Sequence, residues 1–198
     1  MFRPKNPGPA GRGMDSRGPR CYHARPNTLL GGAMENVRVT GYYPGVVGEL
    51  TRLHAVYYHE HWGFDVSFET QVGAELSRFM ASMDPGLDGF WAARDSGGKF
   101  LGAAAVDHGA DSGLGARLRW FIVDPTAQGL GLGRELLSRA VAFSDRAGHR
   151  GMFLWTFAGL DRARRLYESQ GFALAEEHEA RQWGAVIREQ RFVRPPGP

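Results

Sequence analysis

One segment of the sequence constrains the fold more than any other: an apolar stretch runs into a glycine-rich turn and then into an amphipathic helix. The turn is Gln128-Gly129-Leu130-Gly131-Leu132-Gly133, and a helix is expected over residues 131–147, with Gly148 as its C-terminal cap. The first turn of a helix has backbone N–H groups without intrahelical partners, at the positive end of the helix dipole. Glycines let a backbone approach a ligand closely, so the segment predicts an anion site.

Two common nucleotide motifs do not fit this turn. A P-loop needs Gly-Lys-Ser/Thr after the turn, whereas Gly133 is followed by Arg134 and Glu135. The dinucleotide fingerprint needs G-x-G-x-x-G and an acidic residue about 20 positions later. Here the spacing is G-x-G-x-G, and residues 151–156 contain no acid. Arg134 places a cation at the helix start, where it is unfavourable for the helix but suits a bound phosphate.

The pattern of apolar residues predicts one α/β domain with a mixed sheet. In order, it predicts a strand near residues 37–39, helices over 44–62 and 68–79, and strands over 89–94, 99–107 and 117–123. The helix after the glycine turn is followed by a strand over 151–156, a short helix over 160–167, and strands over 172–177 and 185–193. The long hairpins favour a mixed sheet over an all-parallel one.

The amino-acid composition of the chain changes at about residue 34. Residues 1–33 hold six Gly, five Pro, six of the 24 Lys and Arg residues and one of the 21 acidic residues. Such a segment cannot bury enough apolar area to offset its ordering entropy, so we expect a disordered tail before a domain over residues 34–198. The domain itself then has 18 basic and 20 acidic residues, which argues against a nucleic-acid surface.

The amino-acid composition also indicates a cytoplasmic protein. The sequence has no apolar run long enough for a membrane span, and it does not open on a secretory signal. Its one cysteine, Cys21, lies in the tail, so neither a disulfide framework nor a cysteine metal site is expected. His59 and His61 are two residues apart, which directs them to different faces of a helix, and we expect no metal there.

Two motifs together resemble the GNAT superfamily of N-acetyltransferases. Gln128, Gly131 and Gly133 match the pattern Gln/Arg-x-x-Gly-x-Gly/Ala, and Val-Asp-Pro stands upstream, as is usual in that family. About 35 residues downstream, residues 163–172 look like its A-x-x-L-Y-x-x-x-G-F segment. The resemblance covers roughly residues 37–193. It departs at Leu160, where the family often has an asparagine, so a side-chain contact to the cofactor is not expected there.

The resemblance implies an acetyl-CoA-dependent N-acetyltransferase in which an acceptor amine attacks the thioester directly. It also implies a mostly antiparallel central sheet of about six or seven strands with about four helices. The cofactor would bind along the strand before the turn and in the turn itself: Phe121, Ile122, Val123, Gln128, Gly129, Leu130, Gly131, Leu132, Gly133 and Arg134. A non-catalytic acyl-CoA sensor on the same fold is the alternative, and an unrelated phosphate-binding module is a third.

The resemblance also suggests residues for the chemistry and for the acceptor. Tyr167 matches the tyrosine that many relatives use as a general acid, although it also continues an apolar helix stripe and can serve as packing. The base is left open among Glu69, Asp107, His54 and His108, each of which can also be plain surface. Candidate pocket residues for a small-molecule or protein amine are Trp62, Phe64, Glu69 and Arg119, the last of which can hold an acidic group. A homodimer through the last strands is compatible with their alternating pattern.

Overall fold

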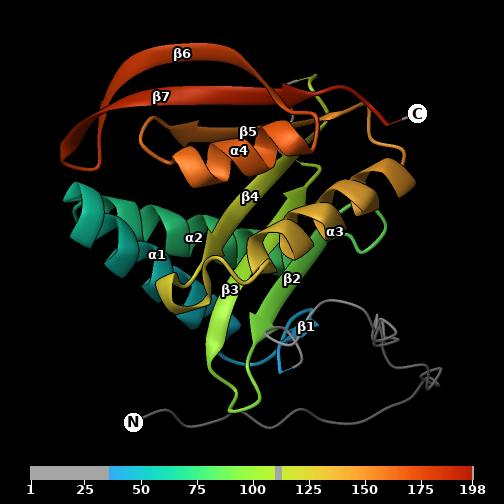
Figure 1. Ribbon diagram of the computed structural model, residues 1–198, viewed down its shortest axis with the longest axis horizontal. Coiled ribbons are helices and arrows are strands. Elements are labelled where there is room, and N and C mark those ends of the chain that lie inside the picture. Colours follow the sequence, from blue (N-terminus) through green and yellow to red (C-terminus); the bar gives the residue numbers. More distant parts are fainter. Residues whose placement is uncertain (1–35, 110–112, 198) are drawn as a thin grey trace, which may run out of the picture.

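The computed structural model describes residues 36–109 and 113–197. Within them the chain forms one seven-stranded sheet in the order β1-β2-β3-β4-β5-β7-β6, in which only β4 and β5 run parallel (Figure 1). The strands are β1 (Arg38–Thr40), β2 (Gly89–Arg94), β3 (Phe100–Asp107), β4 (Ala116–Val123), β5 (Met152–Phe157), β6 (Ala173–Gln182) and β7 (Ala185–Arg194). The mixed, mostly antiparallel sheet predicted from the sequence is confirmed.

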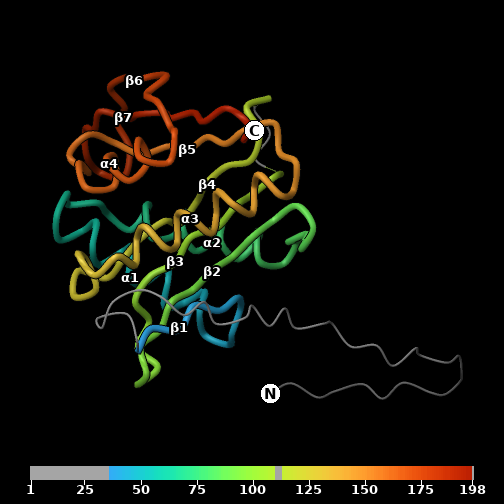
Figure 2. Tube along the Cα trace, turned by 45° about the vertical axis from the view of Figure 1, so that its right-hand side comes forward, coloured from blue at the N-terminus to red at the C-terminus, as the bar shows by residue number. Residues whose placement is uncertain are grey.

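Four α-helices and one short 3-10 helix complete the described part of the chain. They are α1 (Val46–Trp62), α2 (Val66–Ser82), η1 (Pro125–Ala127), α3 (Leu132–Arg146) and α4 (Asp161–Ser169). Figure 2 shows that β5, α4 and the β6–β7 hairpin gather at the end of the molecule opposite β1. The order of helices and strands is the predicted one. The bounds differ most at β6, which runs five residues beyond the predicted Glu177, and the predicted tail lies outside the described residues.

Two apolar cores form on the two faces of the sheet. One packs the buried side of α3 and α4, including Leu136, Leu137 and Tyr167, against residues such as Leu118 and Met152 of the strands. The other packs α1 and α2 against the opposite face, with Trp120 and Ile122 of β4 as members. β4 therefore contributes side chains to both cores, and its position fixes both faces relative to each other.

The alternation of side chains between the two faces of the sheet shifts by one residue partway along β4. Its pairing with β3 shifts register between Ala103 and Ala105, and Trp120 at this bulge has a φ of 46°. A bulge inserts an extra residue and bends the strand. Arg117 and Arg119 before it alternate with the buried Leu118, and after it Phe121 packs against the α3 core while Trp120 packs against the α1–α2 core.

β4 and β5 separate soon after they meet. Their pairing consists of Ala116 with Met152 and Arg117 with Phe153, so the remainder of β4 has no partner strand on that side within the described part of the chain. The junction itself is tight: Gly115 and Gly151 have φ of 96° and 149°, and a Cβ on Gly115 would overlap the carbonyl oxygen of Gly151. That oxygen accepts the Ala116 N–H at 3.0 Å. The two glycines hold the strands together at one end and let them diverge toward the other.

We expect Gly115→Ala to lower the free energy of unfolding by about 3 kcal/mol, because left-handed strain adds to a steric overlap with backbone that cannot move aside. The matched control is Gly98→Ala, at a turn with a φ of 86° and no atom within 4 Å of a new Cβ. It should lower stability by only about 1 kcal/mol. Denaturant unfolding of both variants measures the difference, and equal losses would show that the junction is not tight.

Candidate active site

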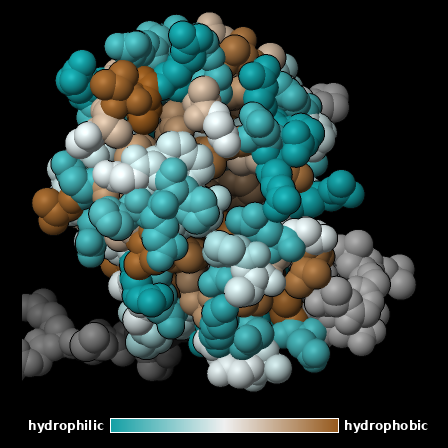
Figure 3. Space-filling model, turned by 60° about the vertical axis from the view of Figure 1, so that its left-hand side comes forward, coloured by the Kyte–Doolittle hydropathy of each residue, from teal (hydrophilic) through white to brown (hydrophobic). Residues whose placement is uncertain are grey.

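The larger of two cavities opens beside the diverging strands. It measures about 1130 Å³ and reaches from the end of β4 across the glycine turn to α4 and α1. Figure 3 shows an apolar-floored hollow between polar surface groups on one side of the molecule. The residues predicted to bind a cofactor line this cavity, except Leu132: Phe121, Ile122, Val123, Gln128, Gly129, Leu130, Gly131, Gly133 and Arg134. The side chain of Leu132 is buried in the core instead, since it lies on the inner face of α3.

The glycines of the turn have two different structural roles. Gly129 and Gly131 have φ of 80° and 91°, and no atom lies within 4 Å of a Cβ built on either. They give the turn its left-handed path and leave the space beside it open to a ligand. Gly133 is helical, and a Cβ there would approach Leu166 Cδ1 at 3.1 Å. It therefore allows α3 to pack closely against α4, and the sequence pattern alone does not separate these roles.

The turn and its surroundings are suited to a polyanion. Gly131 caps the N-terminus of α3 without a side-chain hydrogen bond, so the first N–H groups of the helix have no side-chain acceptor there. Arg134, Arg162 and Arg165 all line the cavity. Arg162 Nη1 donates to Gln128 Oε1 at 3.3 Å, and Gln128 Nε2 donates to the Val123 carbonyl at 3.2 Å, which ties the turn to the end of β4.

A second, smaller cavity lies on the α1–α2 face of the sheet. It measures about 210 Å³ and is bounded by β4, β5, α2 and the β6–β7 hairpin, with Glu75, Arg117, Arg119 and Glu189 as its charged residues. Tyr58, Phe121 and Tyr167 line both cavities. The two cavities thus adjoin where β4 diverges from β5.

Tyr167 lies at this meeting point. Its ring packs against Phe121, Phe172 and Phe192, with a centroid distance of 5.7 Å to Phe121, and the residue is 6% exposed. Burial, and then the nearby Tyr58, raise the pKa of its phenol above the ordinary value, so the hydroxyl holds its proton throughout the neutral range. No other described residue hydrogen-bonds to that hydroxyl. The packing role that the sequence allows for Tyr167 is therefore present, and the residue also lines both cavities.

The predicted acceptor residues divide into three groups. Trp62 lines the larger cavity, and Arg119 lines the smaller one. Phe64 was expected in a pocket and is not: it is 2% exposed and packs among core aromatics. Glu69 was likewise expected there, yet it is exposed on α2 and lines neither cavity, because the buried stripe of that helix passes through Phe68 and Val72 instead.

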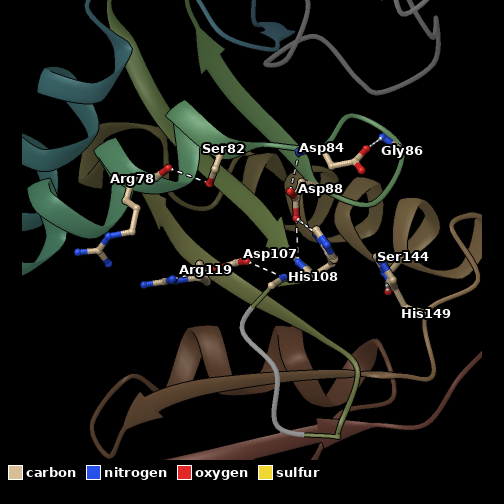
Figure 4. Close-up of polar contacts among 11 residues, drawn as sticks. Arg78, Ser82, Asp84, Gly86, Asp88, Asp107, His108, Arg119, Ser144 and His149 are labelled. Atoms are coloured by element: carbon tan, nitrogen blue, oxygen red, sulfur yellow. Dashed lines mark hydrogen bonds and ion pairs between the residues drawn. The ribbon is translucent and has the colours of Figure 1, made fainter.

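Arg119 is fully engaged within the protein. Its guanidinium pairs with Glu75 and, at 2.9 Å, with Asp107, toward which Figure 4 shows it directed. Asp107 is thereby occupied as well. His108 binds the buried Asp88 at 2.8 Å, and this contact raises its pKa. Neither Asp107 nor His108, two of the residues left open as a base, lines either of these two cavities.

Of the four residues left open as a base, His54 is one that the structure brings to a cavity. It lines the smaller cavity and is 6% exposed. Its Nδ1 lies 3.0 Å from the Leu50 carbonyl, which assigns the proton to Nδ1 and leaves the lone pair on Nε2. Burial lowers its pKa to about 4, so it is neutral at pH 7 and serves as a hydrogen-bond acceptor.

Sequence reasoning missed the residues that β5 and the β6–β7 hairpin bring to the smaller cavity. These include Trp155, Gln182, Trp183 and Glu189. Trp183, at the tip of the hairpin, donates its Nε1–H to Gln71 of α2 at 2.8 Å, a contact across 112 positions of the chain. Arg117 was also missed, although its alternation with Arg119 along one strand is a signal that both face the same side.

Comparison with known proteins identifies the family and the fold. Residues 49–172 match the model of the acetyltransferase (GNAT) family. An uncharacterized N-acetyltransferase of Schizosaccharomyces pombe is 32% identical over 121 residues, which cover 61% of this chain and 73% of the relative. YncA of Salmonella typhimurium, a putative acetyltransferase solved with acetyl-CoA, superimposes with a TM-score of 0.67 at 16% identity, over 82% of this chain and 95% of that one. An acetyltransferase of Streptococcus agalactiae gives 0.64 at 20% identity, over 81% and 99%.

The chain therefore belongs to the GNAT family of acetyltransferases. It is an N-acetyltransferase that uses acetyl-CoA as its acetyl donor, as the sequence motifs predict. Within the described residues, no helix combines the length and the apolar character that a membrane crossing needs.

Removal of His54 should change how stability depends on pH. The unfolded histidine titrates near its ordinary value of 6.5, whereas the folded one titrates at about 4. Between these values the unfolded state binds more protons, so the free energy of unfolding falls as pH drops from 6.5 to 4 and then levels off. We expect His54→Gln to reduce this fall. His61→Gln is the control, because exposed His61 makes the same contact with the carbonyl four residues back; an identical pH profile for all three proteins would contradict the burial effect.

Gly131→Glu should weaken acetyl-CoA binding at least about a hundredfold. The new side chain places bulk and negative charge beside the backbone N–H groups that are expected to bind the anion. Gly148→Glu is the matched control. Gly148 follows the other end of α3 and has a similarly left-handed φ of 73° and open space around its Cβ. Titration calorimetry with acetyl-CoA should show near-normal affinity for the control. Equal losses of acetyl-CoA affinity in the two variants would show that the cofactor does not bind at the turn.

Proposed function

We propose that acetyl-CoA occupies the larger cavity, that the acceptor amine occupies the smaller one, and that the acetyl group passes directly between them. The observation that carries this proposal is the wall of Tyr58, Phe121 and Tyr167 that the two cavities share. A shared wall places two bound molecules on either side of the same three rings. It also removes the need for a covalent enzyme intermediate.

The larger cavity has a distinct place for each part of the cofactor. The N–H groups at Gly129 to Gly131 and the start of α3 can hold the pyrophosphate, with Arg134 beside them. Arg162 and Arg165 can meet a further phosphate. The unpaired edge of β4 over Phe121 to Val123 offers backbone groups to the amide-containing pantetheine arm, as a partner strand would receive them.

Bound there, acetyl-CoA supplies a thioester at the shared wall. The reaction forms a bond from the amine nitrogen to the acetyl carbon and breaks the carbon–sulfur bond. The nitrogen releases one proton to solvent water, and the thiolate takes one from the hydroxyl of Tyr167, which then recovers a proton from solvent. The raised pKa of Tyr167 ensures that the proton is present at the start. A free backbone N–H of β4 can polarise the thioester carbonyl.

The proposal also includes a homodimer and a cytoplasmic location. The exposed strand β6 pairs only with β7 among the described residues, which supports a homodimer through this edge. A cytoplasmic enzyme is supported by the low use of cysteine, one residue in 198, which is typical of chains that rely on a packed core for stability.

Tyr167→Phe should lower kcat by about a hundredfold while it leaves the affinity for acetyl-CoA within about threefold, because the ring still packs and only the proton donor is lost. Tyr42→Phe, at a residue 63% exposed and far from both cavities, is the control. Steady-state release of free thiol measures turnover, and calorimetry measures affinity. Unchanged kcat across the pH range would reduce Tyr167 to a packing residue.

A further inference from the structure

The smaller cavity contains one charged side chain, Arg117, that forms no direct ion pair with a described residue. Arg119 is paired with Glu75 and Asp107. Glu189 accepts from Gln182 at 3.4 Å and lies 3.4 Å from His178 Nε2. Arg117 has no ion pair with any described residue, and its buried Nε has no hydrogen-bond partner.

An unsatisfied guanidinium is costly at this depth. A buried charge or donor without a partner loses its hydration and gains nothing in return. Burial and the neighbouring Arg119 lower the pKa of Arg117, and Glu75, Asp107 and Glu189 oppose part of this shift without pairing directly with it; Arg retains its charge at neutral pH. Native structures seldom leave such a group alone, and those that do often provide it for a ligand.

We propose that the acceptor amine carries a carboxylate, and that Arg117 binds this carboxylate in the smaller cavity. The inference rests on the proposed function, since it assigns the acceptor to that cavity. Arg117 lies four residues before Phe121 along β4, and both line the smaller cavity. An acceptor held by its carboxylate at Arg117 would direct its amine toward the shared wall.

The size and charge of the cavity restrict the acceptor further. About 210 Å³ accommodates a compact molecule. Glu75 and Glu189 line the same space, so a singly charged carboxylate meets less repulsion than a doubly charged phosphate. The same carboxylates suit an ammonium group on the acceptor. Trp155 and Trp183 add apolar surface. A small amino acid satisfies all of these features together.

The test measures binding to the enzyme saturated with CoA, so that it requires no turnover. Each probe pair differs only by a carboxylate: 5-aminovalerate and butylamine, 4-aminobutyrate and propylamine, phenylalanine and 2-phenylethylamine. In at least one pair the amino acid should bind tenfold or more tightly than the amine, the effect expected of a charge-assisted hydrogen bond. Arg117→Gln should remove this preference, and Arg117→Lys should keep part of it.

Arg188→Gln provides the matched control, because it deletes an exposed arginine of β7 that lines neither cavity and pairs with Glu177. It should bind like the wild type. Equal affinities within every pair, including no binding by either member, would overturn the carboxylate assignment. A preference that survives in Arg117→Gln would also overturn it. Failure of CoA itself to bind the wild type would instead contradict the proposed function, and the inference with it.

Discussion

The partial pairing of β4 with β5 is the constraint on which the rest of the structure depends. Two paired positions, secured by close contact between Gly115 and Gly151, join the halves of the sheet. Beyond them the strands diverge, and the bulge at Trp120 turns Phe121 toward the α3 side. Full pairing would place continuous sheet between the two cavities, whereas complete separation would leave α4 and the β6–β7 hairpin without a fixed position. The opening is therefore small and well defined.

The two faces of this opening differ in chemistry. The larger cavity combines left-handed glycines, a helix N-terminus and three arginines, which together favour a polyanionic ligand. The smaller cavity combines aromatic rings with paired charges and one unpaired arginine, which favours a compact and charged acceptor. Buried, protonated Tyr167 lies between them. In the proposed arrangement, a long cofactor and a small acceptor approach from opposite sides and meet at these rings.

The sequence predicted local features well and distant ones poorly. The glycine turn, the order of elements and the position of Tyr167 depend on short patterns, and the structure contains each of them. Phe64 and Glu69 were misassigned because a pattern at a helix junction does not show which side chains the neighbouring strands will cover. Arg119 was predicted as an acceptor ligand, yet Glu75 of α2 and Asp107 of β3 engage it. The contribution of Glu189 depends on how the β6–β7 hairpin folds over the sheet, which no local pattern encodes.

A crystal structure of the enzyme with CoA tests the central claim most directly, because it locates both ends of the cofactor relative to the opening in the sheet. We expect the pyrophosphate on the N–H groups of Gly129 to Gly131, and the thiol sulfur at the wall formed by Tyr58, Phe121 and Tyr167. The smaller cavity should remain open on the opposite side. A cofactor bound away from the turn, or a sulfur atom far from Tyr167, would contradict transfer between the two cavities.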